Sequence, residues 1–557
     1  MIAILLAGCG HGNSRQVVVI GVDGMDPGFV ERHWNQLPNL RKLHFSRLVT
    51  TSPPQSPVAW STFITGLDPA DHGIFDFVRR DPLTRELSLS TDRILEPRFT
   101  VSLGEYRLPL SGERIEALRK GKAFWQTLSE HGVPVTIVRI PVNYPALHFG
   151  KELSGMETPD LRGTQSTFSF YTDGSAETSR AVPGGLIRKV AVSTGHAELP
   201  LEGPPNPFRK DRAYAQTTLS VDVDPEQAVA RIAVGDELAV IQQGEWSDWI
   251  PVDFALVPHI VQVRGMIRVF AKQLHPGFEL YVSPVNIDPL KPALPISSPS
   301  SFARDMGRYY TVGIAEDTAA LRQGVFDLSQ FLTQSRLVLR DERRLLDESL
   351  TQFRGGFLFF YFSAVDQNSH ILWGKHDAEL LPFYRSVDAA IGEVVRRKPQ
   401  AAVIVMSDHG FSTFDRAVNL NTWLVREGWP PDRAYAVGLN SLYVPGVDRN
   451  LVRDRLLGLT DLQTGVHPVK TLMEMRASGA PDFIVGYAPG YRASWQTGLG
   501  ESADSVFEDN EDAWIADHCI NAADVPGVLF SNRDLGLRDP SLKNLSGAIK
   551  ALFGIRE

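Results

Sequence analysis

Residues 17–24 read Val-Val-Val-Ile-Gly-Val-Asp-Gly, and this stretch decides the fold of the chain. Six apolar or small residues in a row are typical of a buried parallel strand, and this run ends at an acid. Two more apolar runs, at residues 357–362 and 403–406, are followed by Asp366 and by Asp408-His409. Ligands in open α/β sheets bind outside the carboxyl ends of the strands. We therefore expect these side chains to converge on one crevice.

Helical stretches separate the apolar runs. Polar sequence compatible with a helix covers Pro27–Phe45, and Trp60–Thr65 predicts the first turns of a second helix. Ala123–His131 predicts a third helix, which leads into an apolar strand at Val133–Ile140. This alternation predicts an α/β fold with a mostly parallel sheet sandwiched by helices. Residues 17–160 form the first part of this predicted core.

Residues 161–300 have a different pattern, in which short apolar segments are separated by Gly, Pro and Asp without helical stretches. This pattern predicts a mainly antiparallel, β-rich cap inserted into the core. Its segments are Leu186–Ser193, Gln216–Val223, Gln227–Ile232, Glu237–Gln242, Ile260–Ala271 and Phe278–Val285. Helices return at Phe326–Arg354 and at Pro382–Arg397, where the proline fits a first turn. Residues 301–557 are the predicted second part of the core.

The composition bounds the class of protein. A length of 557 residues suggests two to four domains, and 43% hydrophobic with 22% charged residues is ordinary for a globular protein. The net charge of −9 argues against a nucleic-acid polymer as partner, since such binding needs a basic surface. Cys9 and Cys519 are the two cysteines, which excludes a disulfide framework and a thiolate zinc cluster. Any metal must be held by Asp, Glu and His.

The N-terminal segment, residues 1–16, is a potential lipoprotein signal. Its first eight residues are apolar but too short to span a bilayer, and they lack a positive n-region. Residues 6–9, Leu-Ala-Gly-Cys, resemble a bacterial lipobox, after which Cys9 would carry a lipid anchor. This interpretation predicts a cell-envelope protein, either periplasmic or membrane-anchored. The alternative is a short apolar tag on a cytoplasmic protein.

Two pairs of residues have spacings that suit metal binding. Asp366 and His370 are four residues apart, which places both on one face of a helix. The alternative is an ordinary Asp–His pair on a helix surface. Asp408 and His409 are adjacent at a strand end, where Gly410 permits the turn that both need to reach one ion. The alternative there is a capping Asp beside a surface His.

Asp23 and Ser56 are further candidates. Asp23 lies nearer its strand end than Asp26, which with Pro27 behind it fits a helix N-cap. Ser56 lies in a Pro-rich loop before the helix at Trp60, where a hydroxyl could act as a nucleophile if a metal lowered its pKa. The alternative for Ser56 is an ordinary loop or capping serine.

His72 also invites interpretation as a ligand, within His-Gly-Ile-Phe-Asp-Phe at residues 72–77. It lies beyond the helix that would separate it from the other candidates. We predict a structural role for it.

Taken in order, these motifs resemble the alkaline phosphatase superfamily, and specifically its type I phosphodiesterase/nucleotide pyrophosphatase-like branch of bacterial phosphohydrolases and phosphomutases. The resemblance runs over nearly the whole chain from residue 17. It is carried by residues 56–66 (Ser-Pro-Val-Ala-Trp-Ser-Thr-Phe-Ile-Thr-Gly), 72–77, 141–145, 154–159, 364–370 (Ala-Val-Asp-Gln-Asn-Ser-His), 407–411 (Ser-Asp-His-Gly-Phe), 516–519 (Ala-Asp-His-Cys) and 525–530.

The resemblance implies a site with two divalent metal ions. One ion would be held by Asp366, His370 and His518, and the other by Asp23, Asp408, His409 and the Ser56 oxygen. Three Asp and three His favour Zn²⁺, with Mn²⁺ as the alternative.

The resemblance also implies that Ser56 is the nucleophile, at a position that is often threonine in this branch. Its neighbours Gln55 and Pro57 have no hydroxyl, while Ser52 and Ser61 are the alternative nucleophiles. No arginine is an obvious phosphate clamp. Arg79, Arg80 and Arg139 are the candidates.

The predicted function is a metal-dependent phosphohydrolase, a phosphodiesterase rather than a monoesterase, that acts through a phosphoryl-serine intermediate. Two ions about 4 Å apart would clamp the phosphoryl group. The alternatives are a phosphomutase or phospho-headgroup transferase, and a surface binding protein that keeps the fold without catalysis. The expected substrate is a small phosphate ester, either phospholipid-like or nucleotide-like.

Overall fold

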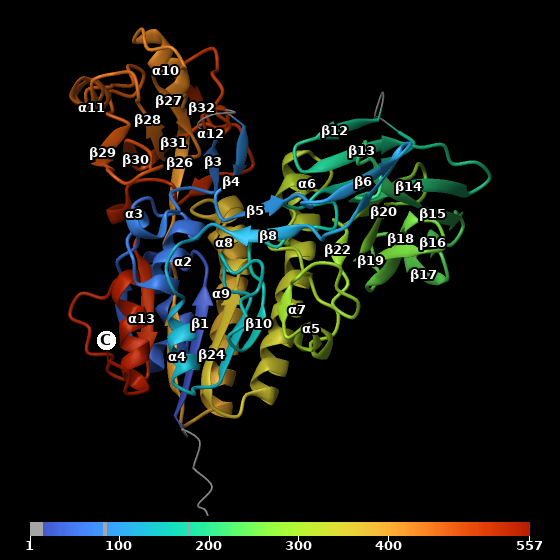
Figure 1. The fold of residues 1–557 in the computed structure, drawn as a ribbon, viewed down its shortest axis with the longest axis horizontal. Helices are drawn as coiled ribbons and strands as arrows, with labels where there is room; N and C mark the ends of the chain where they lie inside the picture. Colours follow the sequence, from blue (N-terminus) through green and yellow to red (C-terminus); the bar gives the residue numbers. More distant parts are fainter. Residues whose placement is uncertain (1–14, 82–85, 175–178, 557) are drawn as a thin grey trace, which may run out of the picture.

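The computed structural model describes residues 15–81, 86–174 and 179–556 and is built around an eight-stranded sheet (Figure 1). The strands from β25 to β10 pair in parallel, while the pairs that involve β34 and β23 are antiparallel. The predicted α/β fold with a mostly parallel sheet is therefore confirmed. In sheet order the strands are β2 (His44–Leu48), β34 (Gly527–Ser531), β25 (Ala402–Met406), β1 (Gln16–Val22), β24 (Gly356–Phe362), β9 (Val135–Val138), β10 (Lys151–Leu153) and β23 (Ser297–Ser298).

Helices cover both faces of this sheet, because successive side chains of a buried strand point to opposite faces. Val18 and Ile20 of β1 pack in the cluster that includes α7 (Leu328–Gln352) and α9 (Asp377–Arg397). Val17 and Val19 pack in the opposite cluster, with residues of α2 (Ser56–Thr65), α4 (Phe124–Glu130) and α13 (Leu542–Leu552). The continuous apolar runs of the sequence are thus buried on both sides.

The stretch predicted as helix at Pro27–Phe45 is only partly helical. Only α1 (Pro27–Arg32) is α-helical. Two single 3₁₀ turns follow, and Phe45 belongs to strand β2. Pro38 interrupts the stretch, since it has no N–H to donate, and the next backbone N–H, that of Asn39, bonds to the Asp388 carboxylate. A tertiary contact therefore replaces the helical hydrogen bond here.

Two predicted helix starts were also wrong. α2 begins at Ser56, not near Trp60, and Pro57 occupies its second position, where a missing N–H costs nothing. α9 begins at Asp377, so Pro382 lies inside the helix and not in its first turn. Ser56 is consequently a helix residue and not a loop residue.

The middle of the chain is rich in strands, which form separate sheets beside the core (Figure 1). One sheet has the order β12-β13-β11-β21-β20, a second β14-β15-β16-β17 and a third β18-β19-β22. Their pairs are antiparallel except β11–β13. The strands are β11 (Phe168–Thr172), β12 (Arg180–Val182), β13 (Gly185–Lys189), β14 (His196–Pro205), β15 (Tyr214–Asp224), β16 (Val229–Val234), β17 (Glu237–Gln242), β18 (Ile250–Val257), β19 (Val261–Ile267), β20 (Val269–Gln273), β21 (Glu279–Val282) and β22 (Asn286–Ile287). The boundaries of the cap at 161–300 stay a prediction.

Short strands also occur in both parts assigned to the core. Six antiparallel strands between residues 78 and 117 were not predicted: β3 (Val78–Arg80), β4 (Leu87–Leu89), β5 (Asp92–Leu95), β6 (Thr100–Leu103), β7 (Tyr106–Pro109) and β8 (Arg114–Ala117). The C-terminal part has further small sheets, with the orders β31-β26-β32 and β27-β28-β30-β29. Their strands are β26 (Ser412–Val418), β27 (Tyr435–Val437), β28 (Ser441–Tyr443), β29 (Val469–Glu474), β30 (Phe483–Tyr487), β31 (Gly490–Ala493), β32 (Phe507–Asp509) and β33 (Ala516–Asp517), the last of which pairs with β26.

The remaining helices are short. They are α3 (Pro69–His72), α5 (Ser300–Asp305), α6 (Thr318–Arg322), α8 (Ala364–Leu372), α10 (Leu420–Arg426), α11 (Arg449–Leu457) and α12 (Trp495–Gly498). Within the described ranges, no helix is long and apolar enough to cross a membrane. Cys9, the predicted site of lipidation, lies outside the described residues.

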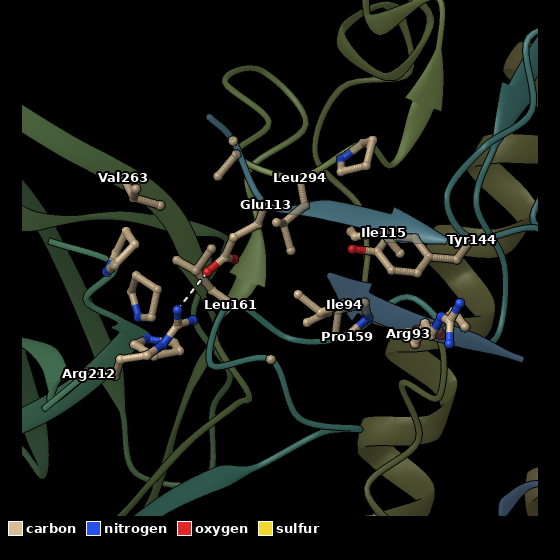
Figure 2. Close-up of a pocket in the computed structure, with 18 of the residues that line it drawn as sticks. Arg93, Ile94, Glu113, Ile115, Tyr144, Pro159, Leu161, Arg212, Val263 and Leu294 are labelled. Carbon is tan, nitrogen blue, oxygen red and sulfur yellow. Dashed lines mark hydrogen bonds and ion pairs between the residues drawn. The ribbon is translucent and has the colours of Figure 1, made fainter. Parts of the chain in front are cut away.

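A cavity of about 760 Å³ lies between the core and the β-rich middle segment (Figure 2). Residues of β5 and β8 line it on one side, and residues of β14, β18 and β19 line it on the other.

Candidate metal centre

The predicted ligands lie at the carboxyl ends of the three central parallel strands. Asp23 directly follows β1, Asp408 and His409 follow β25 after Ser407, and Asp366 lies in α8 just after β24. All four side chains are buried. Gly24 is required beside them, since its φ is +65° and a Cβ there would lie 2.8 Å from the Asp366 Oδ1.

Asp23, Asp408 and His409 form one group whose potential ligand atoms all lie within 4.8 Å of one another. The His409 Nε2 lies 3.4 Å from the Asp23 Oδ1 and 3.2 Å from the Asp408 Oδ2. The Ser56 Oγ lies 3.3 Å from the same Asp23 oxygen and 3.2 Å from the His409 Nε2. The hydroxyl of Ser56 thus adjoins this group.

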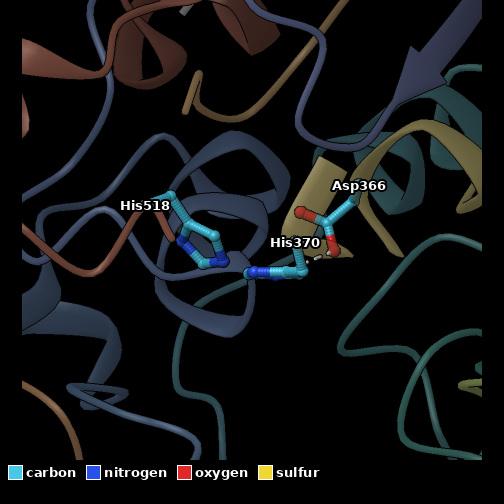
Figure 3. A group of neighbouring side chains, drawn as sticks. All are labelled: Asp366, His370 and His518. Atoms are coloured by element: carbon cyan, nitrogen blue, oxygen red, sulfur yellow. Dashed lines mark ion pairs between the residues drawn. The ribbon is translucent and has the colours of Figure 1, made fainter. Parts of the chain in front are cut away.

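Asp366, His370 and His518 form a second group that meets the same 4.8 Å criterion. Figure 3 shows the His370 ring between the Asp366 carboxylate and the His518 ring. The His370 Nε2 lies 3.5 Å from the Asp366 Oδ2, across one turn of α8. The His409 Nε2 lies 3.9 Å from the Asp366 Oδ1, and the rings of His409 and His518 stack at 3.6 Å. The two groups are therefore neighbours, and together they contain six of the seven predicted site residues, with Ser56, the seventh, beside the first group.

Backbone carbonyls orient two of the imidazoles. The His370 Nδ1 lies 2.8 Å from the carbonyl oxygen of Ala516, and the His518 Nδ1 lies 2.7 Å from that of Pro54. A carbonyl can only accept, so each Nδ1 carries the proton and each Nε2 keeps a free lone pair. Metal-binding histidines are commonly fixed in this way.

The charges of the site fit a divalent cation. Burial and repulsion by Asp23 raise the pKa of Asp408 well above its ordinary value. Burial disfavours the charged form of His409, but Asp408 and Asp23 outweigh it and raise the pKa of His409 to about 10. Burial and His409 lower the pKa of His518 to about 4. The Asp366 Oδ1 and the Asp408 Oδ2 have no hydrogen-bond donor although they are buried. Crowded carboxylates, imidazole nitrogens and unpaired carboxylate oxygens are the donor set that zinc and related ions bind.

Ser56 is fixed by the residue before it. The Gln55 Nε2 donates to the Asp76 Oδ2 at 2.9 Å and to the Asn440 Oδ1 at 2.7 Å. Asp76 also accepts the backbone N–H groups of Leu439 and Asn440. Because this network is buried, it holds the start of α2, and with it the Ser56 hydroxyl, in one position.

Sequence reasoning missed several residues that position the ligands. The Tyr361 hydroxyl and the Trp60 Nε1 donate to the Asp23 Oδ2 at 2.6 and 3.0 Å. Trp514 stacks on His370 at 3.7 Å. Asp517 accepts the backbone N–H of His518 at 2.7 Å. Trp60 could have been predicted, because it lies four residues after Ser56 and therefore on the same face of α2.

A third group, Asp517, His518 and Cys519, also has ligand atoms within 4.8 Å. The Asp517 Oδ2 already accepts from Arg492 at 2.7 Å and from the Trp514 Nε1 at 3.0 Å. Burial and Asp517 raise the pKa of the Cys519 thiol well above its ordinary value, which keeps it neutral. We therefore interpret Asp517 as a residue that positions His518 through its backbone N–H, and not as a ligand of a third ion.

The remaining candidates lie outside the two groups. His72 is buried, with its Nε2 3.0 Å from the Thr62 hydroxyl and its Nδ1 accepting the Ile74 N–H. Arg139 forms a buried ion pair with Glu342 at 3.1 Å. Arg79 donates to the Ser88 hydroxyl, and the guanidinium of Arg80 lies over the Tyr435 ring.

Comparison with known proteins places this geometry in context. The family model for type I phosphodiesterase/nucleotide pyrophosphatase matches residues 17–178 and 298–507, which is more than half of the chain. No curated protein matches the sequence. Phosphonoacetate hydrolase from Sinorhizobium meliloti 1021, solved with phosphonoacetate, is 14% identical with a TM-score of 0.49, and the alignment covers 97% of this chain and 96% of that one. Murine ectonucleotide pyrophosphatase/phosphodiesterase 5 is 9% identical with a TM-score of 0.44 and coverages of 97% and 95%, and an inactive variant of it has been solved with AMP.

Proposed function

We propose that this chain, a member of the type I phosphodiesterase/nucleotide pyrophosphatase family, is a metal-dependent phosphodiesterase with Ser56 as nucleophile. The predicted membership of the alkaline phosphatase superfamily is thereby confirmed. Family membership supports a phosphoric ester hydrolase. The role of Ser56 as nucleophile is proposed from one observation. Its Oγ lies 3.3 Å from the Asp23 Oδ1 and 3.2 Å from the His409 Nε2, beside two buried Asp/His groups.

We propose that the two groups hold one divalent ion each, with zinc favoured by the three histidines. Bound there, such ions would stabilise the serine alkoxide and offset the charge of the phosphoryl oxygens. Asp23, Asp408 and His409 would hold one ion next to Ser56, and Asp366, His370 and His518 would hold the other.

The reaction then has two displacement steps. The Ser56 Oγ attacks the phosphorus of a diester, the P–O bond to one alcohol breaks, and that alcohol leaves with a proton. The product is a phosphoryl-Ser56 that still bears the second alcohol. Water attacks the same phosphorus, the bond to the Ser56 Oγ breaks, and a phosphomonoester and free serine result.

The chain's own residues prepare this reaction. The Gln55–Asp76–Asn440 network fixes the nucleophile, and Tyr361 and Trp60 hold the Asp23 carboxylate. Burial of the site excludes bulk water and strengthens its electrostatic interactions. We propose a diester rather than a monoester because two of the three candidate clamps are engaged elsewhere: Arg139 pairs with Glu342, and Arg79 donates to the Ser88 hydroxyl.

The test is hydrolysis of bis-p-nitrophenyl phosphate and p-nitrophenyl phosphate by chelator-stripped protein reloaded with zinc or manganese. We expect metal-dependent turnover of the diester, and a loss of about 10³-fold or more in Ser56→Ala. The matched control is Ser61→Ala, which removes a buried hydroxyl from the next turn of α2. Full activity of Ser56→Ala, or turnover that does not depend on metal, would contradict the proposal.

A further inference from the structure

The β6–β7 hairpin carries an exposed apolar face. Val101 pairs with Leu108 and Leu103 with Tyr106, and the N–H of Leu110 bonds to the carbonyl of Phe99. Directly opposed residues, two apart along each strand, share one face of a ladder. These six side chains are between 52% and 79% exposed. Exposed apolar surfaces of this kind mark interaction sites.

The hairpin is held firmly against the β-rich middle segment. The Arg107 Nε donates to the carbonyl oxygen of Pro207 at 3.0 Å, and its backbone N–H donates to that of Phe208 at 2.9 Å. Just before β8, Glu113 accepts a hydrogen bond from Arg212 at 2.7 Å, an ion pair visible at the edge of the cavity (Figure 2). The apolar face therefore belongs to a hairpin that hydrogen bonds hold in place.

The hairpin adjoins the cavity of about 760 Å³. Pro97 and Pro109, at the base of the hairpin, line the cavity, whose other walls are mostly proline and aliphatic residues such as Ile115, Leu161 and Val263. This volume is typical of pockets for small-molecule ligands. Apolar residues thus form both the exposed face of the hairpin and most of the walls of the pocket at its base.

The pocket has unpartnered polar atoms at its inner end. The Tyr144 hydroxyl and the Glu157 Oε1 are buried without a hydrogen-bond partner. Figure 2 shows the Tyr144 hydroxyl turned toward Ile115 across the pocket. Buried polar groups are normally satisfied, so these atoms point to a ligand that supplies an oxygen there.

Contacts link the wall of the pocket to the residue before Ser56. Burial raises the pKa of Glu157 to about 8, and the charges of Asp92 and then Asp23 add to this rise. Asp92, in the pocket wall, lies two residues from Ser90, whose hydroxyl donates to the carbonyl oxygen of Asp76. Asp76 in turn binds Gln55, the residue before Ser56.

The charge of the hairpin favours a neutral surface as its partner. Residues 96–114 contain three acidic and three basic residues and so carry no net charge. A charged partner would need a complementary excess of one sign.

We propose that the substrate is a phosphate diester with a hydrocarbon chain, that this chain lies in the pocket, and that the hairpin face docks the enzyme on the lipid surface that supplies it. The inference rests on the proposed function and names the substrate class of the same site. The oxygens between the phosphate and the chain of a glycerol-based lipid would meet Tyr144 and Glu157.

The docking part is tested by sedimentation with phosphatidylcholine vesicles, using the full chain with Cys9→Ser so that no lipid is attached. Leu103→Ser/Leu108→Ser removes two exposed hairpin side chains, and we expect about 10-fold weaker vesicle binding. The matched control Leu238→Ser/Val240→Ser removes two side chains of similar exposure from β17, and we expect it to bind like the parent. Equal binding by both double variants, or no binding by the parent, overturns the docking.

The pocket part is tested with methyl and octyl p-nitrophenyl phosphate on the zinc-loaded protein. We expect kcat/KM to be about 100-fold higher for the octyl diester, since buried methylenes add favourable free energy. Val263→Trp fills the pocket and should remove this preference, whereas Val240→Trp, at an exposed position of β17, should keep it. Equal turnover of the two diesters overturns the pocket assignment but leaves the proposed function intact.

Calorimetric titration with ethylphosphonate and octylphosphonate separates the two failures. One outcome supports the pocket assignment but contradicts the proposed function. In it, neither diester is turned over, octylphosphonate binds at least about 10-fold tighter than ethylphosphonate, and Val263→Trp abolishes that difference in affinity. Equal binding of both phosphonates overturns the pocket assignment.

Discussion

The metal centre and the pocket beside it differ in how they are built. The centre is assembled at the ends of three central parallel strands, from side chains that are at most 3% exposed. The pocket is assembled from loops and strands of four separate segments between residues 88 and 295, and the hairpin beside it is open to solvent. Under the proposed function, the residues at the sheet edge carry out the chemistry, whereas the β-rich middle segment and the hairpin select the substrate that reaches them.

Asp23→Asn should have the largest effect, because it removes a charge that adjoins both Ser56 and His409. We expect diester turnover by the zinc-loaded enzyme to fall about 10³-fold and bound zinc to fall below that of the parent. Turnover and elemental analysis of the same sample measure both. Asp26→Asn is the matched control, since Asp26 caps α1 through the Phe29 N–H and Asn also caps well. A similar loss in both variants would show that the region matters only for folding.

Asp517→Asn should have a moderate effect, because it acts through His518. Asp517 binds Arg492 at 2.7 Å and the His518 backbone N–H, and neither is a proposed ligand contact. Supporting residues of this kind typically contribute 10–100-fold in metal affinity, and we expect about that loss in a competition titration with a zinc chelator. Asp517→Glu should not restore the zinc affinity, since the longer side chain moves the carboxylate away from the His518 N–H. Unchanged zinc affinity would place Asp517 outside the centre.

These two predictions bear on what the sequence could reveal. Asp23, Asp408 and His409 were predicted because apolar strands that end in Asp or His place those residues at one sheet edge, and Asp366 and His370 because of their four-residue spacing after a third such strand. His518 and the role of Ser56 as nucleophile were predicted from the family resemblance. Tyr361 could not be found in this way, since its hydroxyl binds Asp23 from a strand position that reads as ordinary core. The helix start at Ser56 was missed because a serine-proline pair is typical of both a loop and a first turn.

The pocket could not be predicted, and the reason is physical. Its walls come from residues 88–115, 144–165, 204–212 and 256–295, whose mutual positions depend on long-range packing. The hairpin at 100–109 has apolar alternation on a single exposed face, which by itself would indicate a half-buried strand. Its exposure depends on what the other face binds, and no local pattern encodes that.

Asp92→Asn should change stability rather than chemistry, and it is the smallest effect. Burial raises the pKa of Asp92 to about 6. Between its ordinary value of 3.8 and about 6, the unfolded chain ionises while the folded chain holds the proton, so stability is lost as pH rises through this window. Asp92→Asn should therefore stabilise the protein at pH 7 by up to about 3 kcal/mol and change nothing near pH 3.

Urea unfolding at the two pH values measures this effect. The control is Asp253→Asn, which should act in the opposite direction, since an ion pair with Arg264 lowers the pKa of Asp253. Equal stability of Asp92→Asn and the parent at pH 7 would show that Asp92 is hydrated in the pocket wall.

The account rests most directly on the covalent chemistry of Ser56. The zinc-loaded protein would be mixed with bis-p-nitrophenyl phosphate, quenched in acid within the first turnovers, digested and analysed by mass spectrometry. We predict a p-nitrophenyl phosphoryl group on the peptide that contains Ser56, and its absence in Ser56→Ala. An adduct on Ser52 or Ser61, or rapid turnover without any adduct, would contradict the proposal that this hydroxyl is the nucleophile.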